Sequence, residues 1–241
     1  EDCLRLESLL QADMQPADSL SADYYSLFGS LHQQLGNNLA AIGYFNKEVS
    51  LRKILLPEGP EAYSDALFNL MYANALEGYY RGAFEVGTEL LTFDKNQFGA
   101  ESSKFIQSLG DFVDVLVQID QPQKALIELK KVLPQLSVGS IYSGLVEAKL
   151  GYVCTYMGLH RNAERAFVGA LKVFEQTSGS ASLEYQLTLS NYGNLLIEQG
   201  KYDKADEILS ASLAIIANAD WSNKEQLYYA ALNNLSIVTQ M

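Results

Sequence analysis

The hydrophobic and polar positions of this chain follow a helical period and recur in blocks of about forty residues. Each block holds a stretch of helical spacing, a turn residue of the glycine type, and an alanine five residues later within a second helical stretch. The five turn residues and their alanines are Gly36 and Ala41, Gly78 and Ala83, Asp120 and Ala125, Gly158 and Ala163, and Gly200 and Ala205. This recurrence predicts stacked pairs of antiparallel helices.

The spacing of the alanines indicates that the pairs stay in phase. Successive alanines are 42, 42, 38 and 42 residues apart, and the shorter step differs from the others by about one helical turn. We expect each alanine to lie where its two helices approach most closely. We also expect each turn residue to adopt the left-handed conformation that lets a chain reverse out of a helix.

Turn-rich segments separate the blocks, and none is long and polar enough to be a flexible linker. The sequence therefore predicts one solenoid domain over residues 1–241. Its expected parts are an N-terminal helix within 1–21, a truncated sixth repeat at 222–241, and five repeats at about 22–59, 60–98, 99–138, 139–180 and 181–221. Because the first and last parts look like incomplete helix pairs, we expect the chain to be a fragment of a larger protein.

Two segments carry a more specific signature. One is Leu150-Gly151, then Gly158, Ala163, Phe167 and Ala170-Leu171; the other is Tyr192-Gly193, then Gly200-Lys201-Tyr202, Ala205 and Leu209. These residues resemble the tetratricopeptide repeat family, in its long variety of about 42 residues found in kinesin light chains and many bacterial regulators. The resemblance implies a bacterial source. The resemblance covers about residues 22–241. It departs from the family pattern where Met71 and Val113 replace the small first-helix residue.

The resemblance implies an all-α fold, a right-handed α-solenoid whose first helices line a concave, protein-binding face. Aligning the repeats on their alanines predicts which side chains face inward. The candidate binding residues are Asn69, Tyr72, Asp111, Asp114, Gln118, Lys149, Tyr152, Tyr156, Asn191, Asn194 and Glu198.

The chemistry of these candidates indicates a type of ligand. Asn69 and Asn191 occupy equivalent points, where a side-chain amide could bond a ligand's backbone or, equally, the neighbouring helix. The tyrosines offer apolar faces with a polar tip. Because acids outnumber Lys149 in this set, we expect a basic or neutral protein segment as partner.

Composition excludes several classes of function. Seventeen Lys and Arg stand against 29 Asp and Glu, giving a formal net charge of −12, so no nucleic-acid partner is expected. No apolar run is long enough to span a membrane. His32 and His160 belong to no metal-ligand spacing, and no phosphate-binding or nucleophile motif occurs. We therefore expect no metal, no cofactor and no catalytic residue.

Other interpretations remain open. The main hypothesis is a noncatalytic binding module that serves as a scaffold or adaptor. The alternative is a regulatory or sensory segment of a larger signalling protein, such as a sensor kinase or a caspase-like protease, acting through intramolecular contacts. End-to-end self-association competes with both, through the apolar positions Leu4, Leu6, Leu9, Leu232, Leu235 and Val238. Trp221 is expected to wedge between the last helices.

Overall fold

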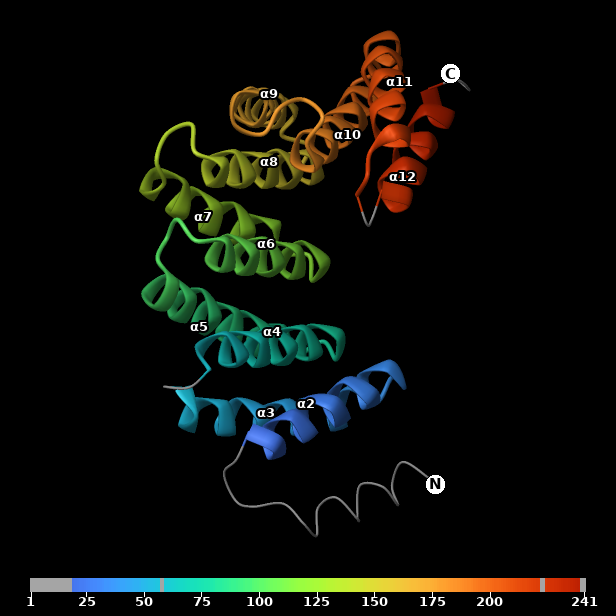
Figure 1. Ribbon diagram of the computed structural model, residues 1–241. Helices are drawn as coiled ribbons and strands as arrows, with labels where there is room; N and C mark the ends of the chain where they lie inside the picture. The colour runs from blue at the N-terminus through green and yellow to red at the C-terminus, as the bar shows by residue number, and fades with distance from the viewer. Residues whose placement is uncertain (1–18, 57–58, 222–223, 239–241) are drawn as a thin grey trace. The chain divides into compact units, whose positions relative to one another are not determined.

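The computed structural model describes residues 19–56, 59–221 and 224–238 (Figure 1). Within these ranges every regular element is helical, so the protein has the expected all-α, α-solenoid class of fold. The helix expected at residues 3–12 lies outside the described residues. None of the described helices combines the length and hydropathy that a membrane span requires.

The chain forms two compact units, and the first ends at Gly99. Its helices are α2 (Ser19–Gln34), α3 (Asn38–Ile54), α4 (Pro60–Leu76) and α5 (Tyr80–Phe98). Each of these helices packs against the next one along the chain. A core of aromatic and aliphatic side chains, including Phe45 and Leu70, joins α3 to α4.

The second unit starts at Ala100 and contains three helix pairs and one further helix. Its helices are α6 (Ser103–Gln118), α7 (Pro122–Val132), α8 (Ile141–Tyr156), α9 (His160–Thr177), α10 (Leu183–Glu198), α11 (Tyr202–Asn218) and α12 (Lys224–Val238), with a 3-10 turn η2 (Leu133–Gln135) after α7. The first helices of successive pairs pack on one another, α6 on α8, α8 on α10 and α10 on α12. This packing builds one continuous face from first helices.

Serine residues cap the first helices α6, α8 and α10. The hydroxyl of Ser140 accepts a hydrogen bond from the Ser143 backbone N–H at 3.1 Å at the start of α8. Ser102 and Ser182 cap α6 and α10 in the same way. Such caps satisfy backbone donors that a helix start leaves unpaired.

The five predicted turn residues all adopt the left-handed conformation. Their φ angles lie between 57° and 82°, and Asp120 is the only non-glycine residue with positive φ in the described ranges. After α8, the N–H of Gly158 bonds the carbonyl of Thr155 at 2.9 Å, and the N–H of Leu159 bonds that of Cys154 at 2.8 Å. These paired bonds close a helix through a left-handed residue, and the prediction is confirmed.

The five marker alanines are also confirmed as close-packing points, because Ala41, Ala83, Ala125, Ala163 and Ala205 are all fully buried. A glycine on the partner helix makes three of these approaches possible. A Cβ on Gly151 would lie 2.6 Å from the Phe167 ring. Gly29 faces Phe45 and Gly193 faces Leu209 with similar closeness.

In the pair α4 and α5 the large and small positions are exchanged. Met71 occupies the first-helix position equivalent to Gly151, and Gly87 occupies the second-helix position equivalent to Phe167. Both residues are buried. The departure of Met71 from the family pattern is therefore matched by a small residue at the equivalent point of the second helix.

The described end of the chain confirms one prediction about packing. Trp221 packs against the small core of Ile216, Leu227 and Ala231 that holds α12 on α11. Leu235 and Val238 are partly buried against the core of α8 to α11, whereas Leu232 stays 36% exposed. Leu4, Leu6 and Leu9 lie outside the described residues.

Candidate binding face

The predicted site residues of the second unit occupy three equivalent positions along the first helices. Asp111, Lys149 and Asn191 lie 14 residues before the buried alanine of their pair, and Asp114, Tyr152 and Asn194 lie 11 before it. Gln118, Tyr156 and Glu198 lie seven before it. Because these offsets differ by about one helical turn, the three positions share one helix face.

A cleft of about 400 Å³ lies between α6 and α8 on this face. Apolar side chains including Ile106, Tyr142 and Leu145 line it. Asp111, Asp114 and Lys149 add charged groups to the same lining. The structure therefore brings three predicted site residues, from two helices, to one recess.

A second cleft of about 350 Å³ adjoins the first, between α8 and α10. Asp114, Leu145 and Lys149 line both clefts. Tyr152 and Asn191, both predicted, contribute to the second one together with other residues of α8 and α10, which are Ala148, Glu184, Leu187 and Thr188. The first-helix face thus carries a recess that continues across three successive helices.

Lys149 forms an ion pair with an acidic residue of the neighbouring first helix α6. Its Nζ atom lies 2.9 Å from each carboxylate oxygen of Asp114. The same Nζ atom lies 5.7 Å from the centre of the Tyr152 ring. This pair neutralises one acid and one base of the predicted set, so the excess of acid over base is unchanged and rests on Asp111 and Glu198.

Asp111 is half-buried beside this ion pair. Burial raises the pKa of its carboxyl, and the negative charge of Asp114 raises it further, while Lys149 and Lys104 act in the opposite direction. Burial likewise raises the pKa of Tyr152, followed by the charge of Asp114. The Asp111 carboxylate therefore lies in surroundings that favour the approach of a cation.

The remaining candidate residues do not line these clefts. Gln118, Tyr156, Asn194 and Glu198 are exposed and line neither of them. Asn69 and Tyr72 belong to the first unit, where both are partly buried and Tyr72 stacks on Phe68 with ring centres 6.2 Å apart. Their part in binding stays a prediction.

The apolar half of the lining was not predicted from the sequence. Leu145 and Leu187 both lie 18 residues before the buried alanine of their pair, so the register itself would have identified them. They were missed because only polar and aromatic side chains were selected. Tyr142, one turn before Leu145, was missed although it is aromatic.

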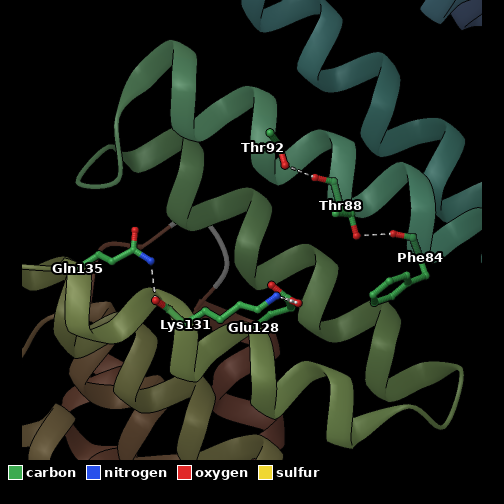
Figure 2. Close-up of polar contacts among 6 residues, drawn as sticks. All are labelled: Phe84, Thr88, Thr92, Glu128, Lys131 and Gln135. Atoms are coloured by element: carbon green, nitrogen blue, oxygen red, sulfur yellow. Dashed lines mark hydrogen bonds and ion pairs between the residues drawn. The ribbon is translucent and has the colours of Figure 1, made fainter.

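Some polar groups of the second helices α5 and α7 bond within their own helix. Figure 2 shows Thr88 donating to the Phe84 carbonyl at 2.8 Å on α5, and an ion pair between Lys131 and Glu128 at 2.7 Å on α7. Both are contacts within one helix. The bond from Lys149 to Asp114, by contrast, joins two first helices.

Groups that could support catalysis lie elsewhere. Cys154 is buried, and burial raises the pKa of its thiol. His32 stacks on Tyr44 in the first unit with ring centres 5.3 Å apart. Across the described ranges, no group of three or more His, Cys, Asp or Glu side chains is arranged to hold a metal ion.

Comparison with known protein families gives a match within the second unit. Residues 141–218, which span α8 to α11, match the model of the Tetratricopeptide repeat family. The match covers two helix pairs, α8 with α9 and α10 with α11. The resemblance predicted from the sequence, including the long kinesin-light-chain-like variety, is confirmed.

Solved structures with the same fold include several tetratricopeptide-like repeat proteins. BtubC (BKLC) from P. vanneervenii is 16% identical with a TM-score of 0.64, over 83% of this chain and 85% of that one. A putative kinesin light chain from Podosopora anserina is 16% identical with a TM-score of 0.58, over 83% and 97%. RapI in its apo form is 13% identical with a TM-score of 0.66, over 96% and 68%. No curated protein sequence matches the chain.

Proposed function

We propose that this protein is a binding module, and that the face formed by α6, α8 and α10 holds an extended segment of a partner protein. The observation that carries the proposal is the pair of adjoining clefts that share Asp114, Leu145 and Lys149. A continuous recess across parallel first helices suits a ligand that runs along several repeats.

The lining supports a protein ligand through its mixture of groups. Leu145, Leu187 and the tyrosine rings offer apolar area for side chains, and Leu187 is 42% exposed. Asn191 carries an amide that can both donate to and accept from a peptide backbone. Apolar walls with a few placed polar groups are the usual composition of a ligand site.

The charge of the face favours a basic or neutral segment. The two clefts contain Asp111, Asp114 and Glu184 against Lys149, which Asp114 already neutralises. A partner segment with an uncompensated carboxylate would be repelled here. One solved structure with this fold, 16% identical and aligned over 65% of its length, is a Rap protein complexed with Competence and Sporulation Factor, which is consistent with ligand binding by such repeats.

A random peptide library tests the proposal. Fifteen-residue peptides displayed on phage are selected against the whole chain, and the affinity of enriched peptides is measured by fluorescence anisotropy. We expect Leu187→Glu to weaken binding at least tenfold, because it places a charge in the second cleft.

A matched variant controls for nonspecific effects of the new charge. Val168→Glu adds the same side chain at a similarly exposed position on the second helix α9, where Val168 is 52% exposed. Binding should persist in this variant. Equal loss in both variants, or no loss in Leu187→Glu, would contradict the proposed face.

A further inference from the structure

We infer that the cleft between α6 and α8 is a pocket for one arginine side chain of the partner, with the guanidinium at Asp111. This inference rests on the proposed function, because it assigns one contact of the segment that this face would bind. Nothing in the family match or in the similar structures assigns such a pocket to these residues.

The shape and walls of the cleft fit a long side chain with a charged end. Its volume of about 400 Å³ exceeds what one arginine requires, so backbone can enter with it. Tyr142, Leu145 and Val146 line the α8 side, and Ile106 belongs to the α6 side. Such walls suit the three methylene groups of arginine, which bury well along apolar surface.

Gly110 keeps the α6 side of the cleft open. It lines the cleft between α6 and α8, and a Cβ there would meet only the Lys149 side chain, at 3.6 Å. In the first unit the equivalent position of α4 carries the large ring of Phe68. The absence of a side chain at Gly110 thus leaves room beside the neighbouring Asp111.

Among the charged groups of the cleft, the Asp111 carboxylate would be stabilised most by a bound cation. Both oxygens of Asp114 already accept bonds from Lys149. Asp111 faces that pair and, more weakly, Lys104, and the balance of burial and charge raises its pKa. A cationic side chain at Asp111 would therefore remove an unfavourable charge environment.

The lining favours arginine over lysine. A guanidinium carries five donors in a plane and pairs with a carboxylate through two parallel bonds. Gln107 and Ser103 place further possible acceptors in the same lining. The flat cation can also stack on an aromatic face such as that of Tyr142.

Small-molecule probes test the pocket without a known partner. The whole chain, labelled with ¹⁵N, is titrated with Nα-acetyl-arginine methylamide and, as a neutral isostere, with Nα-acetyl-citrulline methylamide. We expect saturable shifts of the backbone amides around Gly110, Asp111 and Leu145 with the arginine probe, and at least tenfold weaker binding of the citrulline probe.

Two variants then separate charge from shape. Asp111→Asn should bring the apparent affinity for the arginine probe down to that for citrulline. Gly110→Met should abolish the binding of both probes by filling the cleft. Its circular dichroism should show the same helix content as the parent. Shifts that are equal for the two probes, unchanged in Asp111→Asn, or absent altogether would overturn the inference.

The same probes distinguish the inference from the proposed function. If library peptides bind and are lost on Leu187→Glu, but the arginine probe gives no saturable shift near Asp111, the face binds protein and the arginine pocket is wrong. If the arginine probe binds at Asp111 and no peptide depends on Leu187, the pocket stands and the extended face is wrong.

Discussion

At the scale of single residues, most helix crossings set one small side chain against a large one, whereas the crossing of α6 and α7 has Val113 and Leu129 at these positions. Gly151 faces Phe167, and Gly193 faces Leu209, with no space for a Cβ. The pair α4 and α5 has the sizes reversed, through Met71 and Gly87. Close packing at the crossing therefore constrains the pair of residues rather than either one alone.

Replacing glycine by alanine should have opposite effects on stability at Gly151, which lies at a helix crossing, and at Gly110, which lines the cleft. Gly151→Ala would force a Cβ within 2.6 Å of the Phe167 ring, and we expect the free energy of unfolding to fall by about 1–3 kcal/mol. Gly110→Ala meets nothing nearer than 3.6 Å, and better helix propensity should raise it by up to about 1 kcal/mol. Urea denaturation followed by circular dichroism measures both; equal effects would contradict the crossing geometry.

Asp120 is the one turn residue that strains its backbone. Its φ of 57° lies in the left-handed region, where a side chain costs free energy that glycine avoids. We expect Asp120→Gly to raise the free energy of unfolding by about 0.5–1 kcal/mol, and the reciprocal Gly158→Asp to lower it by a similar amount. Urea midpoints test this, and a loss of stability in Asp120→Gly would show that the Asp120 side chain makes a compensating contact.

At the scale of helices, α3 carries an acid where the other second helices have small or apolar residues. Glu48 lies seven residues after its alanine, a position held by Leu90, Val132 and Ala170 elsewhere. It is only 3% exposed. Burial raises the pKa of its carboxyl to about 7, with Asp23 and Asp65 adding to the rise and Ser26 and Arg52 opposing it.

The stability of the protein should therefore depend on pH through Glu48. Since its folded pKa lies above the ordinary value of 4.5, the folded chain keeps a proton that the unfolded chain loses as pH rises from about 4.5 to 7. The free energy of unfolding should fall across this range, by roughly 3 kcal/mol at most, and level off above it.

The variant Glu48→Gln isolates this contribution, because it keeps the shape and cannot ionise. We expect Glu48→Gln to gain stability relative to the parent as pH rises from 5 to 8 in urea denaturation. A constant difference between the two proteins over that range would mean that Glu48 ionises normally.

The sequence predicted helix order and turn positions well because these depend on local chemistry. A residue that adopts positive φ, such as Gly158, is favoured where a helix reverses, and a small residue such as Ala163 is favoured where two helices pack closely. Both lie as expected. Contacts between helices were harder to predict from the sequence. The register placed Asp114 and Lys149 on one face but could not show that they bond each other, nor that Glu48 is buried.

At the scale of the whole molecule, repetition gives two different kinds of surface in the second unit. First helices bring groups from successive repeats together, as in the bond between Lys149 and Asp114. On the second helix α7, Lys131 and Glu128 pair within the helix. A face built from several repeats can select a ligand longer than any one helix pair contacts, and we propose that binding occurs on that face.

Methyl NMR with a peptide selected from the library tests this assignment most directly. On the whole chain with labelled leucine, isoleucine and valine methyl groups, saturating peptide should shift the methyl signals of Leu145 and Leu187. The signals of Ile127 and Val168, which are exposed on α7 and α9, should stay unchanged. Shifts at Ile127 or Val168 with none at Leu145 and Leu187 would place binding on the second helices and contradict the account.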